Sequence, residues 1–261
     1  MNGGRRMPMF SSFDGVKLHY ETEGEGSPVV LLHGFGASTR TNWVEPGIWS
    51  ALVHAGHRVI GLDARGHGES EKPHDPAFYA DGAMVRDVAE LFDHLALGTA
   101  SVVGYSMGAG TALRFAMSDR RVRLLVLGGI GENMARRVGG QASEEWEQRS
   151  KRIAAALEAD DPSTIDDPTA RGFRRFADRQ GADRLALAAI QRSHRFAGSA
   201  GDISMVQGPA LVIAGDADVD PRPLAAQLPA GRFTVVSGDH LSAVGDPAFA
   251  AAIVEFLAED R

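Results

Sequence analysis

Residues 100–117 read ASVVGYSMGAGTALRFAM, a short β-branched run that leads through G-Y-S-M-G into an apolar helical pattern. Ser106 stands where the expected strand 100–104 turns into the expected helix 107–117. So sharp a turn holds a serine hydroxyl exposed and requires small residues, here Gly104 and Gly108, because the two backbones pass close together. The bare G-x-S-x-G pattern is common. The strand before it and the helix after it nevertheless favour a catalytic serine over an ordinary glycine-rich turn.

The rest of the chain alternates short β-branched runs with longer helical patterns, which is typical of a mostly parallel sheet covered by helices. Several of the runs are apolar throughout, as strands buried on both faces must be. The sequence therefore predicts an α/β fold. We expect strands at 17–23, 29–33, 58–62, 100–104, 122–128, 210–215 and 232–236, and helices at 48–55, 82–97, 107–117, 223–227 and 246–258.

One segment, residues 131–205, departs from this alternation. It contains no convincing strand but shows helical patterns at 144–159, 168–179 and 183–195. Because a structureless loop of that length is rare, we expect a helical cap inserted into a core made of residues 1–130 and 206–261. The cap carries equal numbers of acidic and basic residues, so the net charge of −7 falls on the core. Net charge therefore gives no support for an anionic substrate.

Composition excludes several functions. The chain has 261 residues and no cysteine, which removes a cysteine nucleophile, thiolate-bound zinc and iron–sulfur clusters. An acidic balance argues against nucleic acid as a partner. No apolar run has the length of a secretory signal or a membrane span. We therefore expect a soluble, cytoplasmic protein without a metal or an organic cofactor.

A serine hydroxyl is a poor nucleophile until a base takes its proton, so a histidine and an orienting acid are needed. In folds with this turn, the triad runs in the order serine, acid, histidine. Only His194 and His240 follow Ser106. His194 lies in an expected cap helix, which favours a solvated helix face, whereas His240 follows the last expected strand. We expect His240 to be the base and His33, which precedes the serine, to fix its own loop.

The orienting acid has several candidates in the sequence. Asp216, Asp218 and Asp220 follow the strand 210–215, at the end of a parallel strand where catalytic groups collect. We favour Asp218, with the other two capping the next helix or holding the turn. Glu132, after the preceding strand, is a more distant candidate.

The oxyanion that forms on an attacked carbonyl needs donors fixed in advance. The backbone N–H of Met107, next to the serine at a helix N-terminus, is one expected donor. The N–H of Phe35, in the loop after the strand 29–33, is the other. Candidate substrate contacts are the side chains of Phe35, Tyr105 and Trp146.

With these motifs the chain resembles the α/β-hydrolase superfamily, in a form with a small helical cap. The resemblance rests on LLHGFG at 31–36, DARGHGES at 63–70, GYSMG at 104–108, GDAD at 215–218 and GDH at 238–240. It implies the α/β-hydrolase fold and an acid three residues after the glycine that ends the strand, which favours Asp218. It also implies that segment 63–70 is mainly structural. Ser106 stands where haloalkane dehalogenases and epoxide hydrolases carry aspartate, which disfavours those reactions.

The leading functional hypothesis is a serine hydrolase that cleaves carboxylic esters of small, fairly apolar substrates through an acyl-enzyme. Hydrolases of carbon–carbon bonds, enol-lactone hydrolases and cofactor-free haloperoxidases resemble the chain equally at the serine. Asn42 would be of interest for the first of these, although a turn residue beside Trp43 is the alternative interpretation. A ligand receptor built on a hydrolase scaffold is a hypothesis of another class.

A cap arginine could hold a substrate carboxylate, although most of these arginines are expected to be solvated or in weak surface pairs. Apolar cap residues, Trp146 among them, could equally pack the cap onto the core. The arginine candidates are Arg149, Arg171, Arg174, Arg175, Arg192 and Arg195.

Overall fold

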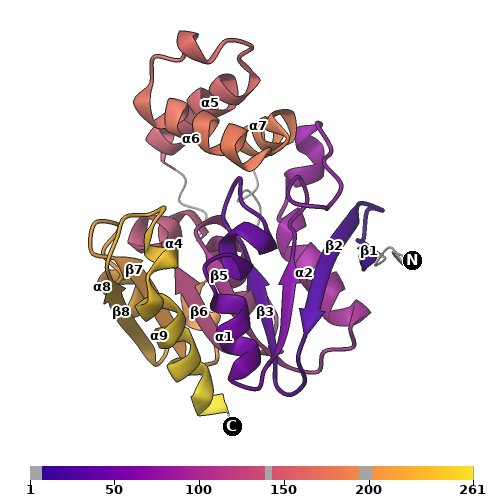
Figure 1. Ribbon diagram of the computed structural model, residues 1–261, viewed down its shortest axis with the longest axis vertical. Helices are drawn as coiled ribbons and strands as arrows, with labels where there is room; N and C mark the ends of the chain where they lie inside the picture. Colours follow the sequence, from indigo (N-terminus) through magenta and orange to yellow (C-terminus); the bar gives the residue numbers. More distant parts are fainter. Residues whose placement is uncertain (1–7, 139–142, 194–201, 261) are drawn as a thin grey trace.

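In the computed structural model, which describes residues 8–138, 143–193 and 202–260, eight strands form one sheet (Figure 1). Their order across the sheet is β1-β2-β4-β3-β5-β6-β7-β8. Only the β1–β2 and β2–β4 pairs are antiparallel, so the expected mostly parallel sheet is confirmed. The strands are β1 Met9–Ser11, β2 Lys17–Glu23, β3 Pro28–Leu32, β4 Arg58–Leu62, β5 Ala100–Tyr105, β6 Val122–Gly128, β7 Ala210–Gly215 and β8 Gly231–Val236.

The helices of the described residues lie on both faces of the sheet and above its upper edge (Figure 1). Short helical turns complete the connections, among them the π-helical turn η1 (Arg40–Val44) and the 3-10 turn η2 (Pro76–Tyr79). The α-helices are α1 Ile48–His54, α2 Ala83–His94, α3 Met107–Ser118, α4 Glu132–Val138, α5 Glu144–Glu158, α6 Pro168–Gln180, α7 Arg184–Arg192, α8 Arg222–Ala225 and α9 Pro247–Leu257.

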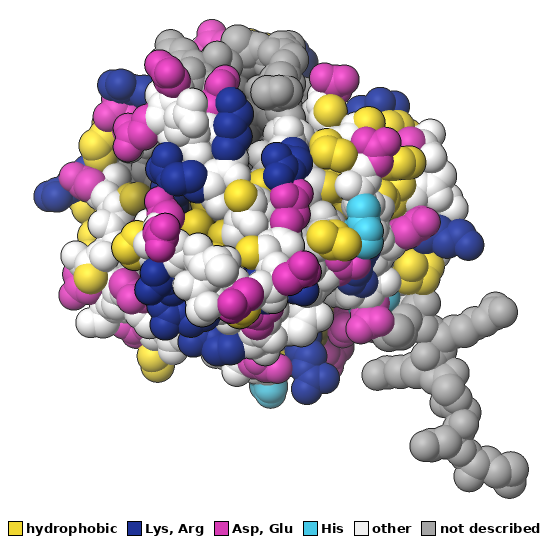
Figure 2. Space-filling model, turned by 90° about the horizontal axis from the view of Figure 1, so that it is seen from above, with side chains coloured by type: hydrophobic (Ala, Val, Ile, Leu, Met, Phe, Trp, Pro, Cys, Tyr) yellow, Lys and Arg dark blue, Asp and Glu magenta, His cyan; other side chains and the backbone are white. Residues whose placement is uncertain are grey.

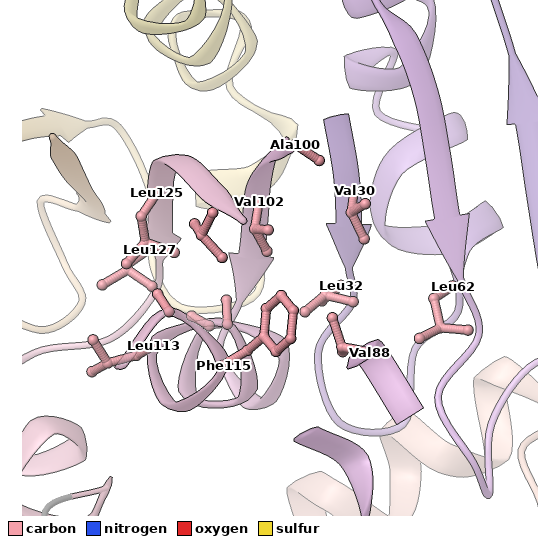
Figure 3. Close-up of a cluster of buried hydrophobic side chains, with 14 of the residues drawn as sticks. Val30, Leu32, Leu62, Val88, Ala100, Val102, Leu113, Phe115, Leu125 and Leu127 are labelled. Atoms are coloured by element: carbon pink, nitrogen blue, oxygen red, sulfur yellow. The ribbon is translucent and has the colours of Figure 1, made fainter. Parts of the chain in front are cut away.

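Apolar strands carry two cores because successive side chains of a strand point to opposite faces. In β3, Val30 and Leu32 pack with α2 and α3, where the tilted rings of Phe115 and Phe92 have centroids 4.9 Å apart (Figure 3). Val29 and Leu31 pack instead with α1 and α9. Because helices cover both faces of the sheet, the sequences of the inner strands are apolar runs without the polar–apolar alternation of a half-exposed strand.

Two elements of the described chain were not expected from the sequence. Strand β1 has only three residues and forms by antiparallel pairing with β2. Helix α4 has seven residues directly after β6. Both are shorter than the windows over which a periodic pattern can be recognised.

Helices α5, α6 and α7 fall within the segment expected to be a cap and pack on one another above the carboxyl ends of β3 and β5 (Figure 1). Their buried side chains form one hydrophobic cluster with Tyr79 of η2 and Met107 of α3. The cluster includes Ile153, Leu157 and Leu187. The described residues 143–193 contain helices and turns but no strand.

At the turn between β5 and α3 the backbones approach one another very closely. A Cβ on Gly108 would lie 2.0 Å from the carbonyl oxygen of Leu32, and one on Gly104 would lie 2.4 Å from that of Gly108. Between them the backbone of Ser106 has φ 51° and ψ −106°, a conformation that residues other than glycine rarely adopt. The serine is therefore held in a strained backbone, which its surroundings must maintain.

This packing leads to a prediction about two helical glycines. Gly108→Ala should lower the free energy of unfolding by about 2 kcal/mol or more, because the backbone of β3 must move to admit the methyl group. Gly172→Ala is the matched control: Gly172 lies in α6 with nothing within 4 Å of its added Cβ. That change should raise the free energy of unfolding by about 0.5–1 kcal/mol. Urea denaturation measures both, and equal stability of the two variants would contradict the argument.

Candidate active site

The structure brings Ser106, His240 and Asp218 together from three separate loops. The Oγ atom of Ser106 lies 2.9 Å from Nε2 of His240. The Nδ1 atom of the same ring lies 3.0 Å and 3.2 Å from the two carboxylate oxygens of Asp218. The Asp218 side chain is 7% exposed and that of His240 42%, so the acid is enclosed while the base is open to a ligand.

Backbone contacts between the loops after β7 and β8 set this geometry. The N–H of Ala217 donates to the carbonyl of Gly238 at 3.0 Å, and the N–H of Gly238 donates to Asp216 at 2.9 Å. Asp216 therefore holds the turn, as expected for an aspartate that is not the acid. The two loops are fixed to one another just before Asp218 and His240.

The remaining acid and base candidates are engaged elsewhere. Asp220 is exposed and accepts from Arg222, and Glu132 accepts from Arg136. His194 lies outside the described residues. Among the sequence candidates that the structure describes, Asp218 alone has its carboxylate at His240.

His33 has the loop-fixing position that the sequence predicts. Its Nδ1–H donates to the carbonyl of Gly34 at 2.8 Å, and its Nε2 accepts the N–H of Ala64 at 3.0 Å. Complete burial lowers the pKa of His33, and the charge of Asp63 does not offset this. Both ring nitrogens are occupied in the neutral tautomer, so His33 has no free nitrogen with which to act as a base.

The loop after β3 lies directly beside Ser106. A Cβ on Gly34 would stand 3.7 Å from Cβ of Ser106. In the described part of the chain, the N–H of Phe35 has no hydrogen-bond acceptor. The N–H of Met107, at the first position of α3, has none within its helix because the first turn never does. These two donors are thus available beside the serine.

Asn42 anchors this loop. Its Oδ1 accepts the N–H of Gly34 at 2.8 Å, and the residue is only 5% exposed. Its Nδ2 is also buried and has no partner among the residues that the structure describes. The sequence offered Asn42 chiefly as a turn residue, and only the folded loop shows that it lies against the backbone beside Ser106.

A buried ion pair supports the same loop from below. Asp63 accepts from Thr39 N–H, from Glu69 N–H and from the ring of His19 at 2.8–3.0 Å. Burial alone would raise the pKa of Asp63, but His19 and the backbone donors hold it well below its usual range. Burial likewise would lower the pKa of His19, and Asp63 outweighs this and raises it. The structural role that the resemblance implies for segment 63–70 agrees with these contacts.

The candidate substrate contacts differ in what they touch. The Tyr105 expectation is corrected, because its ring is 5% exposed and its hydroxyl donates to the carbonyl of His240 at 2.7 Å. Tyr105 therefore supports the histidine loop. Phe35 is half-buried and its ring meets that of Phe173 in α6, with centroids 5.8 Å apart. Trp146 is half-buried on α5.

Most cap arginines proposed as ligands have partners within the protein. Arg171 donates to the carbonyl of Ile165, and Arg174 is buried and donates to Asp178 and to backbone carbonyls. Arg192 pairs with Glu158. Arg175 is exposed, Arg195 lies outside the described residues, and Arg149 is half-buried.

The described residues provide neither a metal site nor a helix that could span a membrane. Within residues 8–138, 143–193 and 202–260, no group of three or more His, Cys, Asp or Glu side chains could hold a metal ion. No helix in those ranges is long and apolar enough to cross a membrane.

Comparison with known proteins gives the family. A soluble epoxide hydrolase of Corynebacterium is 37% identical over 119 residues, which are 44% of this chain and 38% of that protein. A non-heme haloperoxidase of Rhodococcus erythropolis is 35% identical over 112 residues, 42% of this chain and 38% of that protein. The matched stretches thus span less than half of these relatives.

Similarity in three dimensions extends over almost the whole chain. A thermophilic esterase of Thermogutta terrifontis, solved with malate bound, is 25% identical with a TM-score of 0.75, covering 97% of this chain and 98% of that one. Residues 27–175, more than half of the sequence, match the family described as alpha/beta hydrolase fold. The chain therefore belongs to the α/β-hydrolase family.

Proposed function

We propose that this hydrolase cleaves carboxylic esters through an acyl-enzyme on Ser106, with His240 as the base, Asp218 as the orienting acid and residues 131–205 as a cap. The observation that carries the proposal is the unbroken line of contacts from Ser106 Oγ through both nitrogens of His240 to Asp218. The similarity to a thermophilic esterase over nearly its whole length supports it.

The proposed mechanism follows from the position of each proton. With Nδ1–H of His240 donating to Asp218, Nε2 accepts the hydroxyl proton of Ser106 as Oγ bonds to the substrate carbonyl carbon. The negative charge of Asp218 stabilises the imidazolium that results. The carbonyl oxygen becomes an oxyanion, to which the N–H groups of Phe35 and Met107 donate.

The second half follows by the same groups. The tetrahedral intermediate collapses, the bond to the alcohol oxygen breaks, and the alcohol takes the proton from Nε2 of His240. Water then enters, gives a proton to Nε2 and attacks the acyl carbon. When Ser106 Oγ leaves, it takes that proton back and the carboxylic acid is released.

A second candidate is hydrolysis of a carbon–carbon bond next to a carbonyl, which the same nucleophile and base can begin. The buried Nδ2 of Asn42 favours it, because this amide group has no partner among the described residues and lies close to Ser106. An unpaired buried donor beside a nucleophile suits a substrate with an additional oxygen to be bound there.

Replacing the nucleophile gives the direct test. Ser106→Ala should lower kcat/KM for short p-nitrophenyl esters by about a thousandfold or more, because no other group can form the acyl-enzyme. Ser118→Ala, at the exposed far end of the same helix, should leave the rate unchanged. Initial rates with both variants, together with fluorophosphonate labelling of Ser106, measure this. A wild-type protein that cleaves no ester, or a Ser106→Ala variant that keeps its rate, would refute the proposal.

Replacing Asn42 tests the loop beside the serine. Asn42→Ala should lower kcat by about tenfold or more with little change in KM, because the N–H of Phe35 loses its fixed orientation and oxyanion donors act only in the transition state. Asn42→Asp retains the acceptor for Gly34 and should recover part of that loss. Thr41→Ala, at the residue directly before Asn42, is the control. A change confined to KM would show that Asn42 contacts the bound substrate instead.

A further inference from the structure

Arg149 in α5 is distinguished by an unsatisfied donor. Its Nε–H is buried and has no hydrogen-bond acceptor among the residues that the structure describes. A buried polar group without a partner is rare in folded proteins and requires an explanation. A bound ligand would supply the acceptor that the described residues do not provide.

Four other arginines of the same helices do not share this feature. Arg152 pairs with Asp167, Arg174 with Asp178 and Arg192 with Glu158, and the fork of Arg184 donates to backbone carbonyls. Each of these side chains is thus accounted for by the cap itself. Arg149 is the half-buried arginine that remains.

Two aromatic rings lie beside the guanidinium of Arg149. Its guanidinium carbon lies 5.2 Å from the ring centroid of Trp146 and 5.9 Å from that of Phe173. A guanidinium placed against rings keeps its in-plane N–H groups free, and that fork matches the geometry of a carboxylate. The guanidinium of Arg137 also stands over Trp146, at 3.1 Å from the ring centroid. Two guanidinium groups thus lie at one indole.

Arg149 is linked to the nucleophile by consecutive contacts. Phe173 touches Arg149 on one side and the ring of Phe35 on the other, at 5.8 Å between centroids. Phe35 follows Gly34, which lies against Ser106. These contacts place Arg149 and Ser106 at opposite ends of one apolar group of side chains, Phe173 and Phe35.

The surface around the cap does not supply a broad positive field. Seen from above, acidic and basic side chains are interspersed over this face of the molecule (Figure 2). Selection of an anion by general attraction is therefore not expected, and it would have to come from a particular side chain.

We propose that Arg149 binds a carboxylate at the far end of the substrate, so that the preferred ester is a half-ester with an apolar chain between its carbonyl and a terminal carboxylate. This inference rests on the proposed function of Ser106. It changes the expected substrate from a small, fairly apolar ester to an amphipathic ester whose charge is met by a single arginine.

The experiment compares matched anionic and neutral substrates. The mono-p-nitrophenyl esters of adipic, suberic and sebacic acids are assayed beside p-nitrophenyl hexanoate, octanoate and decanoate. The ratio of kcat/KM between anionic and neutral partners should fall by about tenfold or more in Arg149→Met, mainly through KM, because charged hydrogen bonds are lost. Arg149→Lys should recover part of the ratio. Arg175→Met removes an exposed cap charge from α6 and should leave the ratio as in wild type.

A binding measurement separates this proposal from the catalytic one. In Ser106→Ala protein, suberate is titrated by calorimetry with and without Arg149→Met, and thermal melting confirms that each variant is folded. The expected result is about tenfold weaker binding without Arg149. If binding depends on Arg149 but the wild-type protein cleaves no ester, the proposed function is overturned and the inference about Arg149 is not. Unchanged binding and an unchanged substrate ratio in Arg149→Met would overturn the inference.

Discussion

The candidate site depends on one close contact, that between the start of α3 and the carboxyl end of β3. Gly108 approaches the Leu32 carbonyl so closely that no side chain fits between them. That approach places the loop after β3, with the free N–H of Phe35, beside the free N–H at the start of α3. It also holds Ser106 in its strained conformation. Ser106 and the two free N–H groups are therefore positioned by backbone packing.

Around this contact, buried polar groups act as supports for the loops. Asn42 and His33 fix the backbone at Gly34, while Asp63 and His19 hold the strand ends beneath it. Tyr105 ties the loop of His240 to β5. These supporting side chains bond the backbone or one another, and the hydroxyl of Ser106 faces His240.

The inner strands could be predicted from the sequence to within one or two residues because both faces of the sheet are covered and each strand is apolar throughout. Strand β1 and helix α4 could not, since their formation depends on a neighbour and not on their own periodicity. The same division applies to the site. The sequence order selects Ser106 and His240 and the spacing favours Asp218, while only the loop contacts show that Asp216 is used by the Gly238 backbone.

The sequence by itself determined the sheet, the serine on its sharp turn and the presence of helices between β6 and β7, because these are recorded in local periodicity and in the order of motifs along the chain. Only the tertiary structure decided which arginine of the insertion lacks a partner and that Tyr105 supports His240. The reason is physical. Burial and hydrogen-bond pairing depend on residues far apart in the sequence. The sequence alone therefore does not distinguish an arginine that has a partner from one that has none.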